Sequence, residues 1–225
     1  MKRILAAALL AGSMTLATRA AAAESGVEPF LAAPSGPAPS GLSLSLGIGY
    51  GVPLGAATGV SGDAMNKIFS GTLPLQLDVG WRFSPNLYLG AYFDFSPAFV
   101  SSQLSTWEFG IDFLYTFTIQ KSIVLPYAGL GVGYELASYT IKGVSSITGG
   151  SASETATATG WEFVRFIVGV DFRVANAFRV GPFVNFSLGE YTNLSTSGVT
   201  SSSGSISNKA LHEWLQFGIK GTLDL

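Results

Sequence analysis

The residues that could carry acid–base or metal chemistry are few in this chain. His212 is the only histidine among 225 residues, and there is no cysteine. Catalysis needs a positioned base, and no other element of a hydrolytic site stands at a recognisable spacing from His212. Without cysteine there can be no disulfide and no thiolate metal site. We expect a protein that is not an enzyme and holds no metal or cofactor, in which His212 is a solvated residue at a strand start.

The remaining chemistry lies in charged side chains that recur on the polar faces of alternating segments. Acids outnumber bases among them, and they are Arg82, Arg165, Arg173, Arg179, Lys220, Asp78, Asp94, Glu108, Asp112, Glu135, Asp171 and Asp224. A charge that leaves water without a partner costs several kcal/mol, so charges that share an interior must pair. We expect a network of ion pairs, in which Glu135 and Arg165 form one pair on neighbouring strands.

Eight segments with period-two alternation would position these side chains. They are residues 42–52, 73–83, 87–96, 107–117, 124–136, 164–174, 178–188 and 212–225. Because Pro182 cannot donate a hydrogen bond to a ladder, we expect a β-bulge at that position.

The connections between these segments alternate in length. Short turns are expected at Ser84–Asn86, Thr118–Ser122 and Ala175–Ala177, and long loops at 53–71, 97–106, 137–160 and 189–210. The last two loops are rich in Ser, Thr and Gly, and we expect them to be flexible. Short turns at one end and long loops at the other are typical of outer-membrane barrels. The pattern predicts an all-β fold, an eight-stranded antiparallel up-and-down transmembrane β-barrel over residues 42–225.

Composition decides which face of this barrel points outward. Hydrophobic residues make up 48% of the chain and charged residues 12%, whereas a soluble domain usually carries about 25% charged residues. The interior of an eight-stranded barrel is only just wide enough to be filled by side chains, so the large apolar residues of eight strands would not fit there. None of the apolar-face residues is charged, as a lipid-facing surface requires. The apolar face therefore points outward.

Several other classes of protein are excluded. The apolar content excludes a disordered chain, and the formal charge of -2 excludes a nucleic-acid binder. No run of 18 apolar residues follows the N-terminal region, which excludes a helical membrane protein. Aromatic residues gather near the strand ends, where an interfacial girdle belongs. The predicted girdle residues are Tyr50, Trp81, Phe83, Trp107, Phe117, Tyr134 and Phe178.

The N-terminal segment has the features of an export signal. A basic pair precedes the apolar stretch 4–16, and Ala21–Ala23 supply the small residues that signal peptidase needs. We expect a cleaved signal peptide over 1–23, followed by a Pro- and Ala-rich leader over 24–41. The mature chain would start near Glu24.

Two segments and the last strand resemble those of the small eight-stranded outer-membrane β-barrels of Gram-negative bacteria, the OmpA/OmpW-like family. The segments are Pro126–Tyr134 (PYAGLGVGY) and Gly169–Arg173 (GVDFR), and the resemblance covers about 42–225. It implies a place in the cell outer membrane, with lipid and lipopolysaccharide as surroundings. It also implies assembly by the barrel-assembly machinery, which reads the last strand; here that strand ends at Leu225.

Two functions fit these observations. The first is a non-enzymatic outer-membrane barrel with a largely plugged polar lumen and a structural or surface-interaction role through its long extracellular loops. The second, suggested by the OmpW-like side of the resemblance, is a narrow, weakly cation-preferring conduit for small solutes or hydrophobic compounds. The narrow interior favours the plug. The residues name no ligand and leave the oligomeric state open.

Overall fold

A computed structural model describes residues 40–99, 104–119, 122–144, 151–198 and 201–225. The predicted signal peptide and nearly all of the predicted leader lie outside the described residues. The strands are β1 (Gly41–Gly55), β2 (Leu75–Arg82), β3 (Leu87–Pro97), β4 (Leu104–Thr116), β5 (Val124–Val144), β6 (Ser151–Arg173), β7 (Phe178–Ser197), β8 (Ser202–Ser205) and β9 (Leu211–Asp224). One helical turn, α1 (Met65–Ile68), follows β1. None of the described helical residues forms a helix long and apolar enough to cross a membrane.

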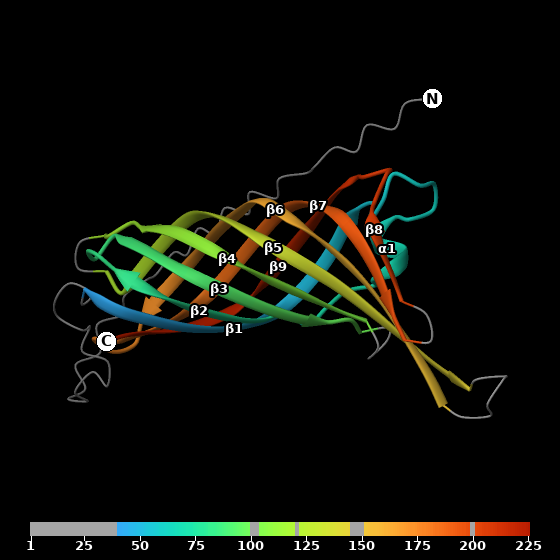
Figure 1. Ribbon diagram of the computed structural model, residues 1–225. Helices are drawn as coiled ribbons and strands as arrows, with labels where there is room; N and C mark the ends of the chain where they lie inside the picture. Colours follow the sequence, from blue (N-terminus) through green and yellow to red (C-terminus); the bar gives the residue numbers. More distant parts are fainter. Residues whose placement is uncertain (1–39, 100–103, 120–121, 145–150, 199–200) are drawn as a thin grey trace, which may run out of the picture. The chain divides into compact units, whose positions relative to one another are not determined.

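All the strands except β8 form a closed antiparallel ring (Figure 1). Strands β1 to β7 pair in chain order, and β9 closes the ring between β7 and β1. The short strand β8 pairs with the end of β7, at Asn193–Thr196. The predicted fold class, an eight-stranded antiparallel up-and-down transmembrane β-barrel, is confirmed.

Side chains alternate between the two faces of the wall as predicted. In β2, Gln76 and Asp78 are buried, whereas Leu77 and Val79 are 40% and 41% exposed. The same alternation holds on the other barrel strands, so most large apolar residues face outward and most lumen residues are polar. The exception is a buried apolar cluster that includes Leu114, Ile167 and Phe183. Registers are strongly specified in such a wall, because a slip of one residue would turn every lumen charge outward.

The barrel has two unlike ends. The end that carries the short turns between β2 and β3, β4 and β5, and β6 and β7 is here called the turn end, and the opposite end is the loop end. The predicted loops 137–160 and 189–210 are largely wrong. Strands β5 and β6 remain paired as far as Val144 and Ser151, and their hairpin extends beyond the barrel at the loop end (Figure 1).

The serine and threonine residues of this hairpin explain the error. Their composition resembles that of a loop, yet their hydroxyls bond across the two strands. Ser138 lies 3.2 Å from Thr157, and Thr140 lies 3.0 Å from Thr155, between the hydroxyl oxygens in each case. Cross-strand Thr pairs of this kind stabilise a sheet.

The expected bulge at Pro182 is also wrong. Pro182 pairs with Ile219 in an unbroken β7–β9 register, and the β6–β7 register is the same on both sides of it. The β6–β7 register shifts elsewhere, between Thr159 and Gly160 and, at a bulge on β6, between Glu162 and Val164. The extra residue of this bulge changes the parity of the strand, so Glu162 and Arg165 both face the lumen although they are three residues apart.

Candidate functional site: the barrel lumen

The lumen is the place where this chain gathers its charged side chains. Every predicted lumen charge except Arg173 is buried, with 4% or less of the residue exposed, and Arg173 is half-buried. These residues come from seven different strands and meet because each occupies a lumen-facing position of a closed ring. They form three groups along the barrel, at the turn end, in the middle and toward the loop end.

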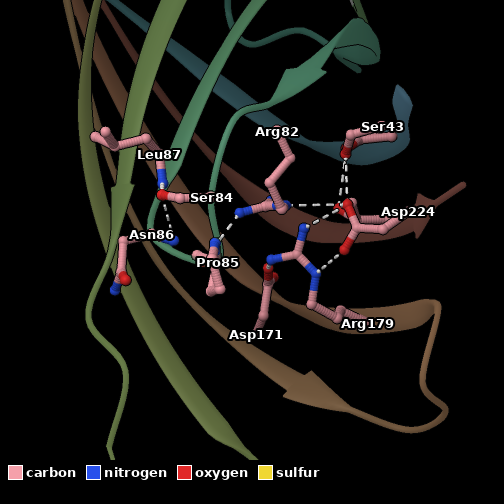
Figure 2. A network of polar contacts seen from close by, with 11 residues as sticks. Ser43, Arg82, Ser84, Pro85, Asn86, Leu87, Asp171, Arg179 and Asp224 are labelled. Atoms are coloured by element: carbon pink, nitrogen blue, oxygen red, sulfur yellow. Dashed lines mark hydrogen bonds and ion pairs between the residues drawn. The ribbon is translucent and has the colours of Figure 1, made fainter. Parts of the chain in front are cut away.

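The turn-end group is centred on Asp224 of β9 (Figure 2). Its carboxylate lies 3.2 Å from Nε of Arg82 and 3.0 Å from Nε of Arg179, and it accepts a 2.8 Å hydrogen bond from the hydroxyl of Ser43. Arg179 also contacts Asp171, with 2.7 Å between Nη1 and Oδ2. Two arginines and two aspartates therefore neutralise one another at the turn end of the barrel, beside the end of β9.

The middle group links a lysine to an amide. Nζ of Lys220 lies 3.3 Å from Oδ2 of Asp78, and Nε2 of Gln76 donates a 2.7 Å hydrogen bond to Oδ1 of the same carboxylate. Oε1 of Gln76 in turn accepts hydrogen bonds from Arg165 at 3.2 Å and from Asn185 at 3.1 Å. Gln76 therefore connects the middle of the lumen to the group nearer the loop end.

Arg165 dominates the group toward the loop end. It is fully buried, and its Nη1 lies 3.3 Å from Oε2 of Glu108 and 3.9 Å from Oε1 of Glu162. Its guanidinium carbon lies 4.2 Å from the centre of the Tyr92 ring, and the Tyr92 hydroxyl donates to Glu162. Since these partners belong to β3, β4 and β6, the Arg165 side chain spans the lumen.

The predicted pair between Glu135 and Arg165 is wrong. Arg165 lies opposite Gly131 on β5, whereas Glu135 lies opposite Gly160 on β6. Four residues of strand, about 13 Å, separate Glu135 from the position that faces Arg165. Glu135 instead contacts the imidazole of His212, with 2.5 Å between Oε1 and Nε2.

His212 is not the solvated rim residue that we expected. It is 0% exposed, and its ring stacks on that of Tyr191 at a centroid distance of 4.1 Å and an interplanar angle of 16°. The position at the start of β9 is near the barrel mouth, but the mouth is covered. This location could not be read from the strand pattern alone.

The cover is the segment between β1 and β2, residues 56–72, here called the cap segment. Its α1 turn presents Met65 and Phe69, which are 0% and 2% exposed, to an apolar cluster with Ala98, Leu104, Tyr191 and Trp214. The Phe69 ring meets the Trp214 indole edge-on at 5.2 Å. Backbone hydrogen bonds of 2.9 Å and 3.0 Å between Gly51 of β1 and Thr72 attach the end of this segment to the barrel wall.

Glu162 is the lumen charge that strand periodicity missed. Counting by two from Arg165 places Glu162 on the lipid face, and only the bulge on β6 turns it inward. One signal in the sequence could have revealed this. A charge between Trp161 and Phe163, both exposed on the outer face, would be costly in lipid, so the strand had to change parity there.

The lumen glycines make room for lumen tyrosines. A Cβ at Gly90 would lie 2.0 Å from the Tyr88 hydroxyl, and one at Gly133 would lie 2.1 Å from the Tyr92 hydroxyl. A Cβ at Gly169 would lie 2.4 Å from the Tyr127 ring. The small residues of the polar faces therefore let these rings fill the interior.

The outer face carries the predicted girdle aromatics. Trp81, Phe83, Phe117 and Phe178 lie toward the turn end, and each is between 40% and 61% exposed. Toward the loop end, Tyr50 and Trp107 are 38% and 37% exposed, and Tyr134 is partly exposed. Their role at a membrane interface remains a prediction.

Within the described residues, no three His, Asp or Glu side chains come together in a way that could hold a metal ion. The buried carboxylates other than Asp112 contact arginine, lysine, histidine or hydroxyl groups instead. The charged side chains therefore pair with one another across the narrow lumen, as expected if side chains fill it.

No protein-family model matches this chain, and none of the curated proteins is similar to it. Its structure is similar to the crystal structure of Neisserial surface protein A, over 83% of this chain and 98% of that one, with a TM-score of 0.50 and 13% identity. The N-terminal β-barrel domain of Pseudomonas aeruginosa OprF matches over 81% of this chain and 99% of its own, with a TM-score of 0.37 and 11% identity. The Escherichia coli outer membrane protease OmpT matches over 83% and 96%, with a TM-score of 0.36 and 10% identity. The chain has the fold of the small outer-membrane β-barrels that its sequence resembles.

Proposed function

We propose that this protein is a non-enzymatic barrel of the cell outer membrane whose polar lumen is plugged. The observation that carries this proposal is the placement of Arg165. Its side chain is fully buried and contacts Glu108 and Gln76 on two other strands, so ion pairs and hydrogen bonds cross the lumen where a pore would run. An eight-stranded barrel leaves little space around such a side chain.

The cap segment is a second barrier at the loop end. Met65 and Phe69 pack on Trp214, so an apolar cluster lies above the charged interior. An ion that entered from this side would have to cross that cluster without water. The same cover argues against catalysis, because His212 lies buried beneath it in contact with Glu135 and Tyr191.

The proposed orientation follows the usual outer-membrane arrangement, with the turn end in the periplasm and the loop end outside. Lipid and lipopolysaccharide would surround the apolar face, and the barrel-assembly machinery would insert the chain after its signal peptide is removed. At the loop end the β5–β6 hairpin and the β7–β8 pair extend furthest and are the surfaces for a structural or interaction role. Tyr139 and Leu194, 42% and 46% exposed, lie on these extensions.

Cell fractionation combined with surface proteolysis tests this proposal. The protein should remain in the membrane fraction until detergent is added, and protease added to intact cells should cut only in the loop-end extensions. A soluble periplasmic protein after gentle lysis, or cleavage confined to the turns, would contradict it.

A narrow conduit for small solutes is the second candidate. The observation that favours it is the excess of acids toward the loop end, where Asp94, Glu108, Glu135 and Glu162 are all buried. Among the described residues, Arg165 contacts only Glu108 and Glu162 of these four acids. Such a lumen would prefer cations if it conducted. Ionic conductance therefore separates the two candidates.

A further inference from the structure

The ion pairs of the lumen form two networks that stop short of each other. The turn-end network runs from Asp224 through Arg179 to Asp171. The second begins at Lys220, which pairs with Asp78, and continues through Gln76 to Arg165. Among the contacts of the described residues, no hydrogen bond or ion pair joins Asp171 to Lys220.

A cavity of about 10 Å³ lies between these two networks. Arg82, Arg179 and Asp171 of the turn-end network line it, and so does Lys220 of the second. The remaining walls include the rings of Tyr88 and Tyr127, and Nζ of Lys220 lies 5.2 Å from the centre of the Tyr127 ring. The cavity therefore stands at the one place where the chain of polar contacts through these two networks is interrupted.

Three residues that line the cavity each have a buried oxygen atom without a hydrogen-bond partner among the described residues. The atoms are Oη of Tyr88, Oη of Tyr127 and Oδ1 of Asp171. Their residues are only 3%, 4% and 3% exposed, so bulk water does not satisfy them. Buried polar atoms of folded proteins nearly always have a partner, either protein or ordered water, and a group of three such atoms around one cavity requires an explanation.

We propose that this cavity binds one water molecule, which joins the two networks. The cavity volume of about 10 Å³ fits one water molecule, because a bound water needs a cavity of about 10–15 Å³ and several polar partners. The charge of the cavity wall also fits, because Arg82 and Arg179 are matched by Asp224 and Asp171, and Lys220 is matched by Asp78, so an added ion would find no counter-charge.

The donors and acceptors match a water molecule as well. Water would accept hydrogen bonds from Nζ of Lys220 and from one of the two tyrosine hydroxyls. It would donate one hydrogen bond to Oδ1 of Asp171 and one to the hydroxyl oxygen of the other tyrosine. The lumen would then be one continuous polar network from Asp224 to Arg165, so the plug would respond as a unit when either part is altered. This inference goes beyond the proposed function, because a plugged lumen does not by itself require a bound water.

The direct test is nuclear magnetic resonance of the full chain refolded in detergent, with selective protonation of the tyrosines. The ring protons of Tyr88 and Tyr127 should show cross-relaxation to a long-lived water, whereas those of lipid-facing Tyr115, which is 42% exposed, should not. Finding no such water at Tyr88 and Tyr127 would overturn the proposal.

Thermal melting provides a second readout. Tyr127→Phe keeps the ring beside Lys220 and removes only the hydroxyl, and Asp171→Asn alters the opposite wall. Each should lower the melting temperature, and the double variant should lower it by less than the sum, because both act through the same water. The pair Tyr115→Phe and Asp171→Asn should be additive. Additive effects of Tyr127→Phe and Asp171→Asn would contradict a bound water. A melting temperature that changes when sulfate replaces chloride in the buffer would also contradict it, because it would indicate a bound ion.

Discussion

The guanidinium of Arg165 on β6 lies 3.3 Å from the carboxylate of Glu108 on β4, so this ion pair passes over the intervening strand β5. Strands β4 and β6 are not neighbours in the ring, so this is not a pair between adjacent strands. A narrow ring makes it possible, because its inner faces converge. The lumen charges therefore choose partners across the barrel as well as along its wall.

Removing Arg165 should be strongly destabilising. Arg165→Ala leaves Glu108 and Glu162 buried without their cation, and loss of one partner of a buried pair typically costs about 3–5 kcal/mol. Urea unfolding of the refolded protein measures this. Lys209→Ala is the control, because its pair with Glu190 is 43% and 24% exposed and such pairs contribute about 0–1 kcal/mol.

A double variant isolates the pair itself. Arg165→Ala combined with Glu108→Gln should cost less than the two single changes together, since the second removes the charge that the first leaves unpaired. The same cycle with Glu135→Gln should be nearly additive, because Glu135 contacts His212. Strong coupling to Glu135 with none to Glu108 would show that the lumen register is different.

A methyl group at a lumen glycine should destabilise the barrel. Gly90→Ala would place Cβ 2.0 Å from the Tyr88 hydroxyl and 2.8 Å from the carbonyl oxygen of Val79. Overpacking of this kind costs about 1–3 kcal/mol, which the unfolding midpoint reports. Gly204→Ala, where no atom lies within 4 Å of the added Cβ, should be close to neutral, and equal effects would argue against a filled lumen.

An arginine on the outer face should impair insertion. Val168 on β6 is 51% exposed, and an Arg near the middle of the lipid face of a barrel costs about 2–4 kcal/mol. Val168→Arg should therefore reduce refolding into lipid vesicles. Val60→Arg is the matched control, because Val60 is 53% exposed but lies on the cap segment. If both variants insert equally well, Val168 does not face lipid.

The cap segment should protect Trp214 from solvent. In a protein whose Trp81, Trp107 and Trp161 are replaced by Phe, Phe69→Ala removes the ring that meets Trp214 at 5.2 Å. Quenching of the Trp214 fluorescence by acrylamide should then rise. Ile68→Ala, at a neighbouring α1 position that is 40% exposed, should leave the quenching unchanged, and a rise in both variants would indicate that the whole segment unfolds.

The wall of the barrel was predictable from the sequence, because lipid outside and a narrow lumen inside leave one acceptable orientation for every strand. The turn at Ser84–Asn86 and the inward placement of Asp78 and Arg82 follow from alternation alone. The β5–β6 hairpin was missed because its Ser and Thr residues suit both loops and paired strands.

The partners of the charges were not predictable in the same way. Which residue meets Arg165 depends on strand register and on reach across the lumen, and neither follows from the period of two. One extra residue on β6 brought Glu162 inward. The burial of His212 depends on the cap segment, which folds back through Met65 and Phe69 from a region without strand periodicity.

The measurement that tests the plugged lumen most directly is the conductance of the purified barrel in a planar lipid bilayer. With Arg165 across the lumen and the cap segment over the loop end, the wild-type protein should insert without stable current steps. Phe69→Ala combined with Arg165→Ala should produce cation-preferring steps if that double variant inserts. Steady, cation-selective steps from the wild-type protein, reduced by Glu108→Gln, would contradict the plug and establish the conduit.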